Sequence, residues 1–240
     1  MPVRGVLFDV DDTLFAYSAS DEAGLLAHLE AEGLLGRFPA PSAAVGLWRE
    51  VTEAEYARFL AGELTFAEHR HARVRRFLAR LGHAAAPELP DREAAAWFAR
   101  YEAHRKATWS AFADAAPVLA ALAPRYRLGV VSNSTLGHQR DKLGSIGLLA
   151  YFGDAVVCAH EHGAAKPAPG IFLAGCAALG LEPHEVAYVG DNHAIDAVGA
   201  RDAGLRAYWL NRTGAAPGTA DGAGITVLGS LDELPAALAG

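Results

Sequence analysis

Cysteine, lysine and long apolar runs are all scarce in this 240-residue sequence. Its two cysteines, Cys158 and Cys176, exclude a disulfide framework, are typical of a reducing compartment and are predicted to lie in the core. Apolar stretches such as 115–123 fall far short of the roughly 20 residues that a membrane-spanning helix needs. Asp9 interrupts the first apolar run before a secretion signal could form. We therefore expect a soluble, cytoplasmic protein with no membrane partner.

Positive charge is also in deficit, because 21 lysines and arginines face 28 aspartates and glutamates and give a net charge of -7. Such a chain has no global basic field to attract nucleic acid, so no nucleic-acid partner is expected. Apolar residues, in contrast, make up 52% of the chain, against 20% charged residues. This composition allows a substantial core and excludes an intrinsically disordered protein. Nothing in it specifies an oligomeric state.

Short apolar runs recur along the chain, with amphipathic segments between them. The predicted strands span residues 3–8, 127–131, 155–158, 186–189, 206–210 and 225–228. Strands that alternate with helices form right-handed βαβ units, and these build a parallel sheet with helices on both faces. The predicted fold class is therefore α/β, with a doubly wound, Rossmann-like parallel sheet. A Gly/Ala/Pro-rich stretch from Thr213 to Gly224 is predicted as a loop.

Residues 16–106 follow a different pattern, because their apolar residues recur at helical spacing. We interpret this segment as a helical cap domain inserted after the first strand, which leaves residues 1–15 and 107–240 as the α/β core. Aromatic residues at helical spacing are predicted to form the core of the cap, with one or two available to line a pocket: Trp48, Tyr56, Trp97, Phe98 and Tyr101.

Polar side chains follow four of the predicted strands, where an open α/β sheet holds its ligand crevice. They are Asp9 and Asp11, Ser132 and Asn133, Lys166, and Asp191. Carboxylates gathered at one place repel each other unless a cation lies between them, and their hard oxygens suit Mg²⁺. A magnesium site that faces an ammonium, a hydroxyl and backbone N–H groups is suited in turn to a phosphoryl group.

Four motifs in this order resemble those of the haloacid dehalogenase-like (HAD) hydrolase superfamily. Residues 9–14, DVDDTL, resemble its first motif, and residues 130–133, VVSN, its second. Lys166 and Pro167 resemble the third, and residues 190–196, GDNHAID, resemble the fourth, GDxxxxD. The inserted helical segment resembles the subfamily I branch, which has a C1-type cap. A single motif of this kind would be weak evidence, whereas four in order are specific.

The resemblance implies a nucleophile and an acid/base two residues apart. Asp9 would attack phosphorus and become an aspartyl phosphate, which divides one difficult displacement into two steps. Asp11 would protonate the leaving oxygen and then activate water, a role for which we expect a pKa above the ordinary value of about 3.9. Asp9, the backbone carbonyl of Asp11, and Asp191 would bind Mg²⁺.

The same resemblance assigns the remaining polar residues. Lys166 would neutralise charge on the nucleophile and the phosphoryl group, so it belongs to both the catalytic and the substrate-binding set. Ser132 and Asn133 would bind phosphoryl oxygens, with Thr13 as a further candidate. Asp196 would support the metal site or Lys166.

The function that follows is a Mg²⁺-dependent phosphatase whose substrate is a small phosphorylated metabolite. A phosphomutase with the same site, or a non-enzymatic phospho-acceptor or binding module, remains an alternative. Haloacid dehalogenases lack the second aspartate of the first motif, so Asp11 argues against that reaction.

Three further segments have competing interpretations. The basic run 68–76 is predicted to be a solvated helix face, with attraction of an anionic substrate as the alternative. His160 and His162 alternate as metal ligands can, but they lack a third ligand at a recognisable spacing. His193 either faces the substrate or lies on a surface helix.

Overall fold

The computed structural model describes residues 2–214 and 223–239. The chain folds into two compact units, which we call the core unit, Met1–Tyr17 with Trp109–Gly240, and the helical unit, Ser18–Thr108. Most of the stretch 213–224, predicted as a loop, lies outside the described residues.

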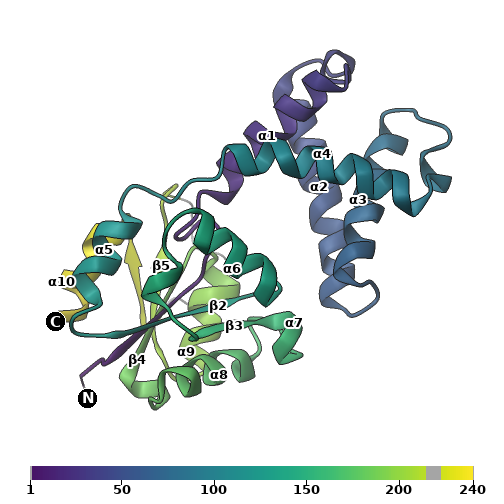
Figure 1. Ribbon diagram of the computed structural model, residues 1–240. Helices are drawn as coiled ribbons and strands as arrows, with labels where there is room; N and C mark the ends of the chain where they lie inside the picture. The colour runs from purple at the N-terminus through teal and green to yellow at the C-terminus, as the bar shows by residue number, and fades with distance from the viewer. Residues whose placement is uncertain (1, 215–222, 240) are drawn as a thin grey trace. The chain divides into compact units, whose positions relative to one another are not determined.

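One six-stranded parallel sheet forms the centre of the core unit (Figure 1). Its order is β3-β2-β1-β4-β5-β6, so β1 lies between β2 and β4. The strands are β1 (Gly5–Phe8), β2 (Arg127–Ser132), β3 (Val156–Cys158), β4 (Val186–Gly190), β5 (Arg206–Leu210) and β6 (Ile225–Leu228). The predicted α/β class and each predicted strand are confirmed.

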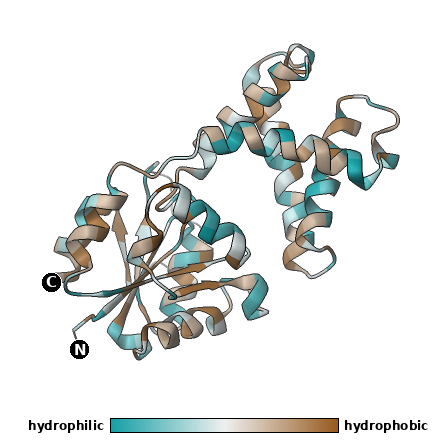
Figure 2. Ribbon diagram, viewed as in Figure 1, coloured by the Kyte–Doolittle hydropathy of each residue, from teal (hydrophilic) through white to brown (hydrophobic). Residues whose placement is uncertain are grey.

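Helices cover both faces of this sheet because successive strand residues point to opposite sides. Val6 and Phe8 belong to one apolar cluster, and Leu7 belongs to another. The residues of β1 are accordingly apolar and buried along its length, and much of the sheet is brown in Figure 2. The helices of the core unit are α5 (Ala115–Leu122), α6 (Leu136–Ser145), α7 (Ala159–His162), α8 (Pro169–Leu179), α9 (Gly199–Asp202) and α10 (Leu234–Ala239).

The helical unit has an apolar core of its own, built between α1 (Tyr17–Ala31), α2 (Pro41–Leu60), α3 (Phe66–Arg80) and α4 (Asp91–Ala107). Thr65 and Glu68 form a capping box that fixes the start of α3. Four of the five aromatic residues predicted for this core are buried, namely Trp48, Trp97, Phe98 and Tyr101. Tyr56 is only half-buried.

Both cysteines are buried, as predicted. Among the described residues, no helix is both long and apolar enough to cross a membrane.

Candidate active site

The carboxyl ends of β1, β2 and β4 bring the sequence motifs together. Because β1 pairs with both neighbours in parallel, the residues that follow the three strands emerge at the same edge of the sheet. The backbone N–H of Asp9 donates to the carbonyl of Val189 over 2.9 Å, which extends the β1–β4 ladder to Asp9.

Lys166 is the centre of a buried polar network. Its Nζ donates to Asp9 Oδ1 at 2.6 Å, to Asp196 Oδ1 at 2.7 Å and to Tyr188 Oη at 2.9 Å, so all three donors of the ammonium are used. Burial lowers the pKa of Lys166, but Asp196 and Asp9 outweigh burial and hold it well above its ordinary value. The charged form of the Lys166 side chain is therefore favoured.

Asn133 positions the main chain of Lys166. Its Oδ1 accepts from the Lys166 backbone N–H at 2.6 Å, and its Nδ2 donates to the Lys166 carbonyl at 3.0 Å. The side chain that we expected at a phosphoryl oxygen thus connects the end of β2 to the lysine loop.

Asp9, Asp191 and Asp196 form the one group of three or more His, Cys, Asp or Glu side chains in residues 2–214 and 223–239 that could hold a metal ion, with one oxygen of each within 4.8 Å of the others. Burial raises the pKa of Asp9 to about 7; Lys166 opposes this, while Asp196 and Asp11 add to it. Burial, with Asp9 and Asp196, raises the pKa of Asp191 to about 8. Ionisation of Asp9 and Asp191 is disfavoured because both carboxyl groups lie in the same partly desolvated site, close to other carboxylates.

The donor set fits Mg²⁺. Three ionised carboxylates and the ammonium of Lys166 sum to a charge of about -2, which one divalent cation neutralises. The carboxylate oxygens are hard ligands of the kind that Mg²⁺ prefers, and no nitrogen or sulfur ligand accompanies them in the group.

Asp196 is held by its own motif. The backbone N–H of Asn192 donates to Asp196 Oδ2 at 3.0 Å, and a π-helical turn, His193–Val198, carries the aspartate back toward β4. A Cβ at Gly190 would lie 2.4 Å from Asp196 Cγ, closer than any side chain tolerates. Glycine at position 190 is therefore required for Asp196 to reach Lys166.

Asp11 lies in a second pair beside this network. Gln139 Nε2 donates to Asp11 Oδ2 at 3.0 Å, and Lys142 Nζ donates to Asp11 Oδ1. Burial raises the pKa of Asp11, but Lys142 and Gln139 together lower it below its ordinary value. The expected rise in the pKa is thus wrong for this arrangement, because a buried ammonium stabilises the charged form.

Ser132 and Thr13 are the two hydroxyl side chains predicted for the site. Ser132 Oγ accepts from Gln139 Nε2 at 2.9 Å. Thr13 is fully buried, and its Oγ1 has no hydrogen-bond partner among the described residues. A buried hydroxyl without a partner suits an added acceptor such as a phosphoryl oxygen.

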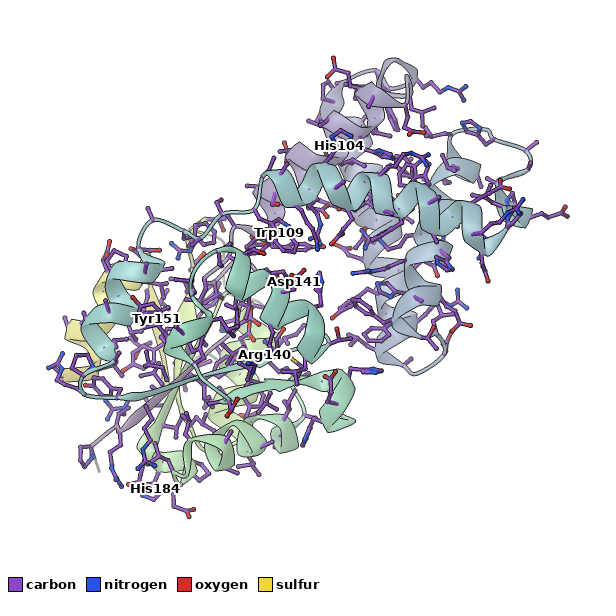
Figure 3. The ribbon with its side chains drawn as sticks, viewed as in Figure 1. His104, Trp109, Arg140, Asp141, Tyr151 and His184 are labelled. Atoms are coloured by element: carbon purple, nitrogen blue, oxygen red, sulfur yellow. The ribbon has the colours of Figure 1, made fainter. Side chains whose placement is uncertain are left out.

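Sequence reasoning missed Tyr188, Gln139 and Lys142. A tyrosine inside a fully buried strand was the available signal, since a buried hydroxyl needs a partner. Helix α6 turns Gln139 and Lys142 inward, whereas Asp141, labelled in Figure 3, is exposed. The scarcity of lysine is a weak signal for Lys142, because it does not distinguish this lysine from the others, and only the rotation of α6 reveals that Asp11 is its partner.

No role was assigned from the sequence to Arg212, which follows β5 and supports the turn that carries Thr13. It forms a bidentate pair with Asp114 at 2.8 and 2.9 Å and donates to the carbonyl of Thr13 at 3.0 Å. The turn that carries Thr13 is thereby fixed to the loop before α5.

The three histidines singled out in the sequence lie on two segments of the core unit. His193 is buried, with its ring centroid 4.8 Å from that of Trp209, so the surface-helix interpretation is wrong. His160 and His162 lie on the short α7, and neither belongs to a group of three metal-ligating side chains within the described ranges.

The sequence matches the haloacid dehalogenase-like hydrolase family over residues 3–204. It is 36% identical over 126 residues to N-acylneuraminate-9-phosphatase of Rattus norvegicus, which covers 52% of this chain and 50% of that protein. The chain thus spans about half the length of this relative. It is 31% identical to glyceraldehyde 3-phosphate phosphatase of Methanopyrus kandleri (85% and 82% covered) and to phosphoserine phosphatase of Thermus thermophilus (86% and 88% covered).

Solved structures share the fold. A magnesium-bound HAD-hydrolase, YfnB of Bacillus subtilis, superposes with a TM-score of 0.81 at 21% identity, with 100% of both chains covered. A 2-haloacid dehalogenase from Pseudomonas syringae has a TM-score of 0.69 at 27% identity, with 99% of this chain and 98% of that chain covered.

Proposed function

Because the chain belongs to the haloacid dehalogenase-like hydrolases, we propose that it is a Mg²⁺-dependent phosphatase that acts on a small phosphorylated metabolite. One observation carries the proposal: Lys166 holds Asp9 Oδ1 next to Asp191 and Asp196. Asp9 Oδ2 accepts no hydrogen bond from the part of the chain that the structure describes. It is the oxygen available to attack.

In the first step, Asp9 Oδ2 forms a bond to phosphorus while the bond to the leaving oxygen breaks. Asp11 donates a proton to that oxygen, so the product leaves as an alcohol. Lys166 offsets negative charge on Asp9 and on the phosphoryl group, and Thr13 Oγ1 is free to donate to a phosphoryl oxygen.

In the second step, Asp11 accepts a proton from water, whose oxygen attacks phosphorus. The bond to Asp9 breaks, and inorganic phosphate is released. The lowered pKa of Asp11 favours the charged carboxylate that accepts this proton, and Gln139 directs it. The same lowered pKa disfavours the protonated form that the first step needs, so Asp11 must take up a proton before that step. We assign Lys142 and Gln139 to positioning Asp11.

Asp9, Asp191 and the backbone carbonyl of Asp11 would hold Mg²⁺, which supplies positive charge against the phosphoryl group. Asp196 uses both oxygens on Lys166, Tyr188 and the Asn192 backbone, so we assign it to positioning Lys166. Ser132 supports Gln139 and remains a candidate for a phosphoryl contact.

The helical unit is proposed to be the cap that selects the substrate. The phosphatase relatives carry names for different phosphorylated small molecules, which supports a metabolite as the substrate class. A monomeric phosphoester, rather than a nucleic acid, is also consistent with the acidic chain.

Hydrolysis of an aryl phosphate tests the proposal. Wild type is expected to release phosphate with Mg²⁺ and not with a chelator, and Asp9→Asn is expected to lose at least about 10⁴-fold in kcat. The fully exposed Asp154 provides the matched control, and Asp154→Asn should retain activity. Activity that survives Asp9→Asn in a folded protein, or chloride release from a 2-chloro acid in place of phosphate release, would overturn the proposal.

A further inference from the structure

Trp209 contacts the carboxylate group of the core unit from the neighbouring strand. It lies on β5 opposite Gly190, the last residue of β4, and the two strands are adjacent in the sheet (Figure 1). Its indole Nε1–H donates to the main-chain carbonyl of Asp191 at 2.8 Å. Asp191 is the first residue beyond β4, so this side chain holds the main chain just past the end of the strand.

The peptide unit that joins Asp191 to Asn192 is held at both of its polar groups. Its carbonyl oxygen accepts from Trp209, and its N–H donates to Asp196 Oδ2 at 3.0 Å. Because a peptide unit is planar, two hydrogen bonds that leave it in opposite directions fix its orientation. That orientation constrains the backbone dihedral angles of Asp191 and, through them, the direction of its side chain.

Asp191 depends on its main chain more than the other two carboxylates do. Asp9 and Asp196 are both held by the ammonium of Lys166, at 2.6 and 2.7 Å. The carboxylate of Asp191, in contrast, accepts no hydrogen bond from the part of the chain that the structure describes. Its position within 4.8 Å of the other two carboxylates is therefore set through the backbone.

His193 packs against the indole of Trp209 and limits its movement. The two ring centroids are 4.8 Å apart and the ring planes make an angle of 69°, which is an edge-to-face arrangement. Both side chains are buried. An indole has a single N–H donor, so rotation away from the Asp191 carbonyl would leave that donor buried and unpaired. The hydrogen bond is thus fixed before any cation binds.

We propose that Trp209 is a positioning residue of the metal site, because its indole N–H holds the main chain of Asp191 and so keeps the carboxylate beside Asp9. The inference rests on the proposed function, in which these two aspartates would hold Mg²⁺. Groups that orient metal ligands contribute about 10- to 100-fold to metal affinity. Trp209 acts on the carbonyl rather than on the carboxylate, so we expect an effect at the lower end of that range.

Mg²⁺ binding by Trp209→Phe tests the proposal. This substitution removes the donor and keeps an aromatic ring against His193. The Kd for Mg²⁺, measured by calorimetry without substrate, should be about tenfold higher than that of wild type. With an aryl phosphate, kcat at saturating Mg²⁺ should stay within about twofold of wild type, while the Mg²⁺ concentration for half-maximal rate should rise about tenfold.

Tyr208→Phe is the matched control on the same strand. Tyr208 is also a buried aromatic residue whose side chain donates to a main-chain carbonyl, that of Ala237, at 3.1 Å. This bond lies away from the carboxylate group, so its loss should leave the Kd for Mg²⁺ unchanged. An unchanged Kd in folded Trp209→Phe, or an equal rise in both variants, overturns the inference.

The indole N–H provides a second readout in the wild-type protein, which keeps the test valid if Trp209→Phe does not fold. The chain has four tryptophans, and the indole nitrogens of Trp48 and Trp97 are buried without a hydrogen-bond partner among the described residues. In ¹H–¹⁵N spectra, the Trp209 indole resonance, identified by elimination with phenylalanine variants of the other three, should shift more on addition of Mg²⁺ than those of Trp48 and Trp97.

Two results separate the inference from the proposed function. A Trp209 resonance that does not move while wild type binds Mg²⁺ and hydrolyses the aryl phosphate overturns the inference alone. Wild type that binds no Mg²⁺ and releases no phosphate overturns the proposed function, and the inference with it.

Discussion

Two buried cations, Lys166 in the core unit and Arg73 in the helical unit, have opposite surroundings. In the core unit, Lys166 directs all three donors to Asp9, Asp196 and Tyr188. In the helical unit, the nitrogens of buried side chains such as His28, Arg73 and Trp48 face aromatic rings without hydrogen-bond partners in the described part of the chain. The core unit holds an electrostatic site that is organised before any ligand arrives.

Under the proposed function, the core unit would perform the chemistry and the helical unit would select the substrate. Phosphoryl transfer depends on charges that are fixed in advance, because reorganisation during the reaction adds to the barrier. Recognition can instead leave donors unfilled until the right ligand fills them, and the wrong ligand then incurs the desolvation cost. Substitutions in either unit test this comparison.

The largest effect is expected at Lys166. Lys166→Met removes the positive charge that Asp9 and Asp196 share and leaves two buried carboxylates without it. Breaking one partner from such a buried network costs about 3–5 kcal/mol, and aryl phosphate hydrolysis should fall at least about 1000-fold. Chemical denaturation and initial rates measure the two losses. A stable, active Lys166→Met protein would contradict the account of the network.

A smaller effect is expected at Lys142, which acts through Asp11. Lys142→Met should lower kcat about 10- to 100-fold while Mg²⁺ affinity stays near the wild-type value, because Asp9 and Asp191 are not its partners. Lys106→Met, at an exposed lysine, is the control and should be neutral. Equal effects at the two lysines would remove Lys142 from the positioning of Asp11.

One substitution should have opposite signs in the two units. Gly190→Ala forces a Cβ against Asp196, so it should cost about 1–3 kcal/mol of unfolding free energy and reduce activity. Gly46→Ala lies in the exposed interior of α2 with open space around it, so it should stabilise by about 0.5–1 kcal/mol. Urea denaturation of both variants checks the pair, and a loss at Gly46 or a gain at Gly190 is the contrary result.

The smallest expected effect is on the pH dependence of stability, which should have opposite signs in the two units. Burial lowers the pKa of His28 and of His69 to about 4, so the helical unit should lose protection from amide exchange as the pH falls from 6.5 toward 4. The pKa values of Asp9 and Asp191 are raised to about 7 and 8, so the metal-free core unit should lose stability as the pH rises from 4 to 8.

Mg²⁺ should reverse the second trend, because it binds the ionised carboxylates. The rise in Tm on addition of Mg²⁺ should therefore be larger at pH 8 than at pH 6, and Asp191→Asn should diminish it. A rise that is independent of pH would contradict the shared burial of these carboxylates.

The sequence predicted the fold well because its two periodicities differ. Apolar runs of strand length marked the buried strands, while helical spacing marked residues 16–106. The motifs also predicted that Asp9, Asp191 and Asp196 lie close together. They do, because the strand order places the carboxyl ends of β1 and β4 side by side.

The partners of these residues could not be predicted. The contact between Lys142 and Asp11 depends on the rotation of α6, which places residues 131 positions apart in contact. The direction of the Asp11 pKa follows from that contact and is invisible in the motif itself. Likewise, nothing in the run 68–76 distinguishes the buried Arg73 from the solvated Arg76, because only packing against Trp48 separates them.

Direct detection of the phosphoenzyme tests the central claim, that Asp9 is the nucleophile. Asp11→Asn, mixed with Mg²⁺ and an aryl phosphate and quenched in acid within the first turnover, should accumulate the intermediate, because an aryl leaving group needs little protonation whereas the attack by water needs a base. Mass spectrometry should then find one added phosphoryl group on the peptide that contains Asp9. Turnover with no phosphoryl group on that peptide, or with the group on another residue, would contradict the account.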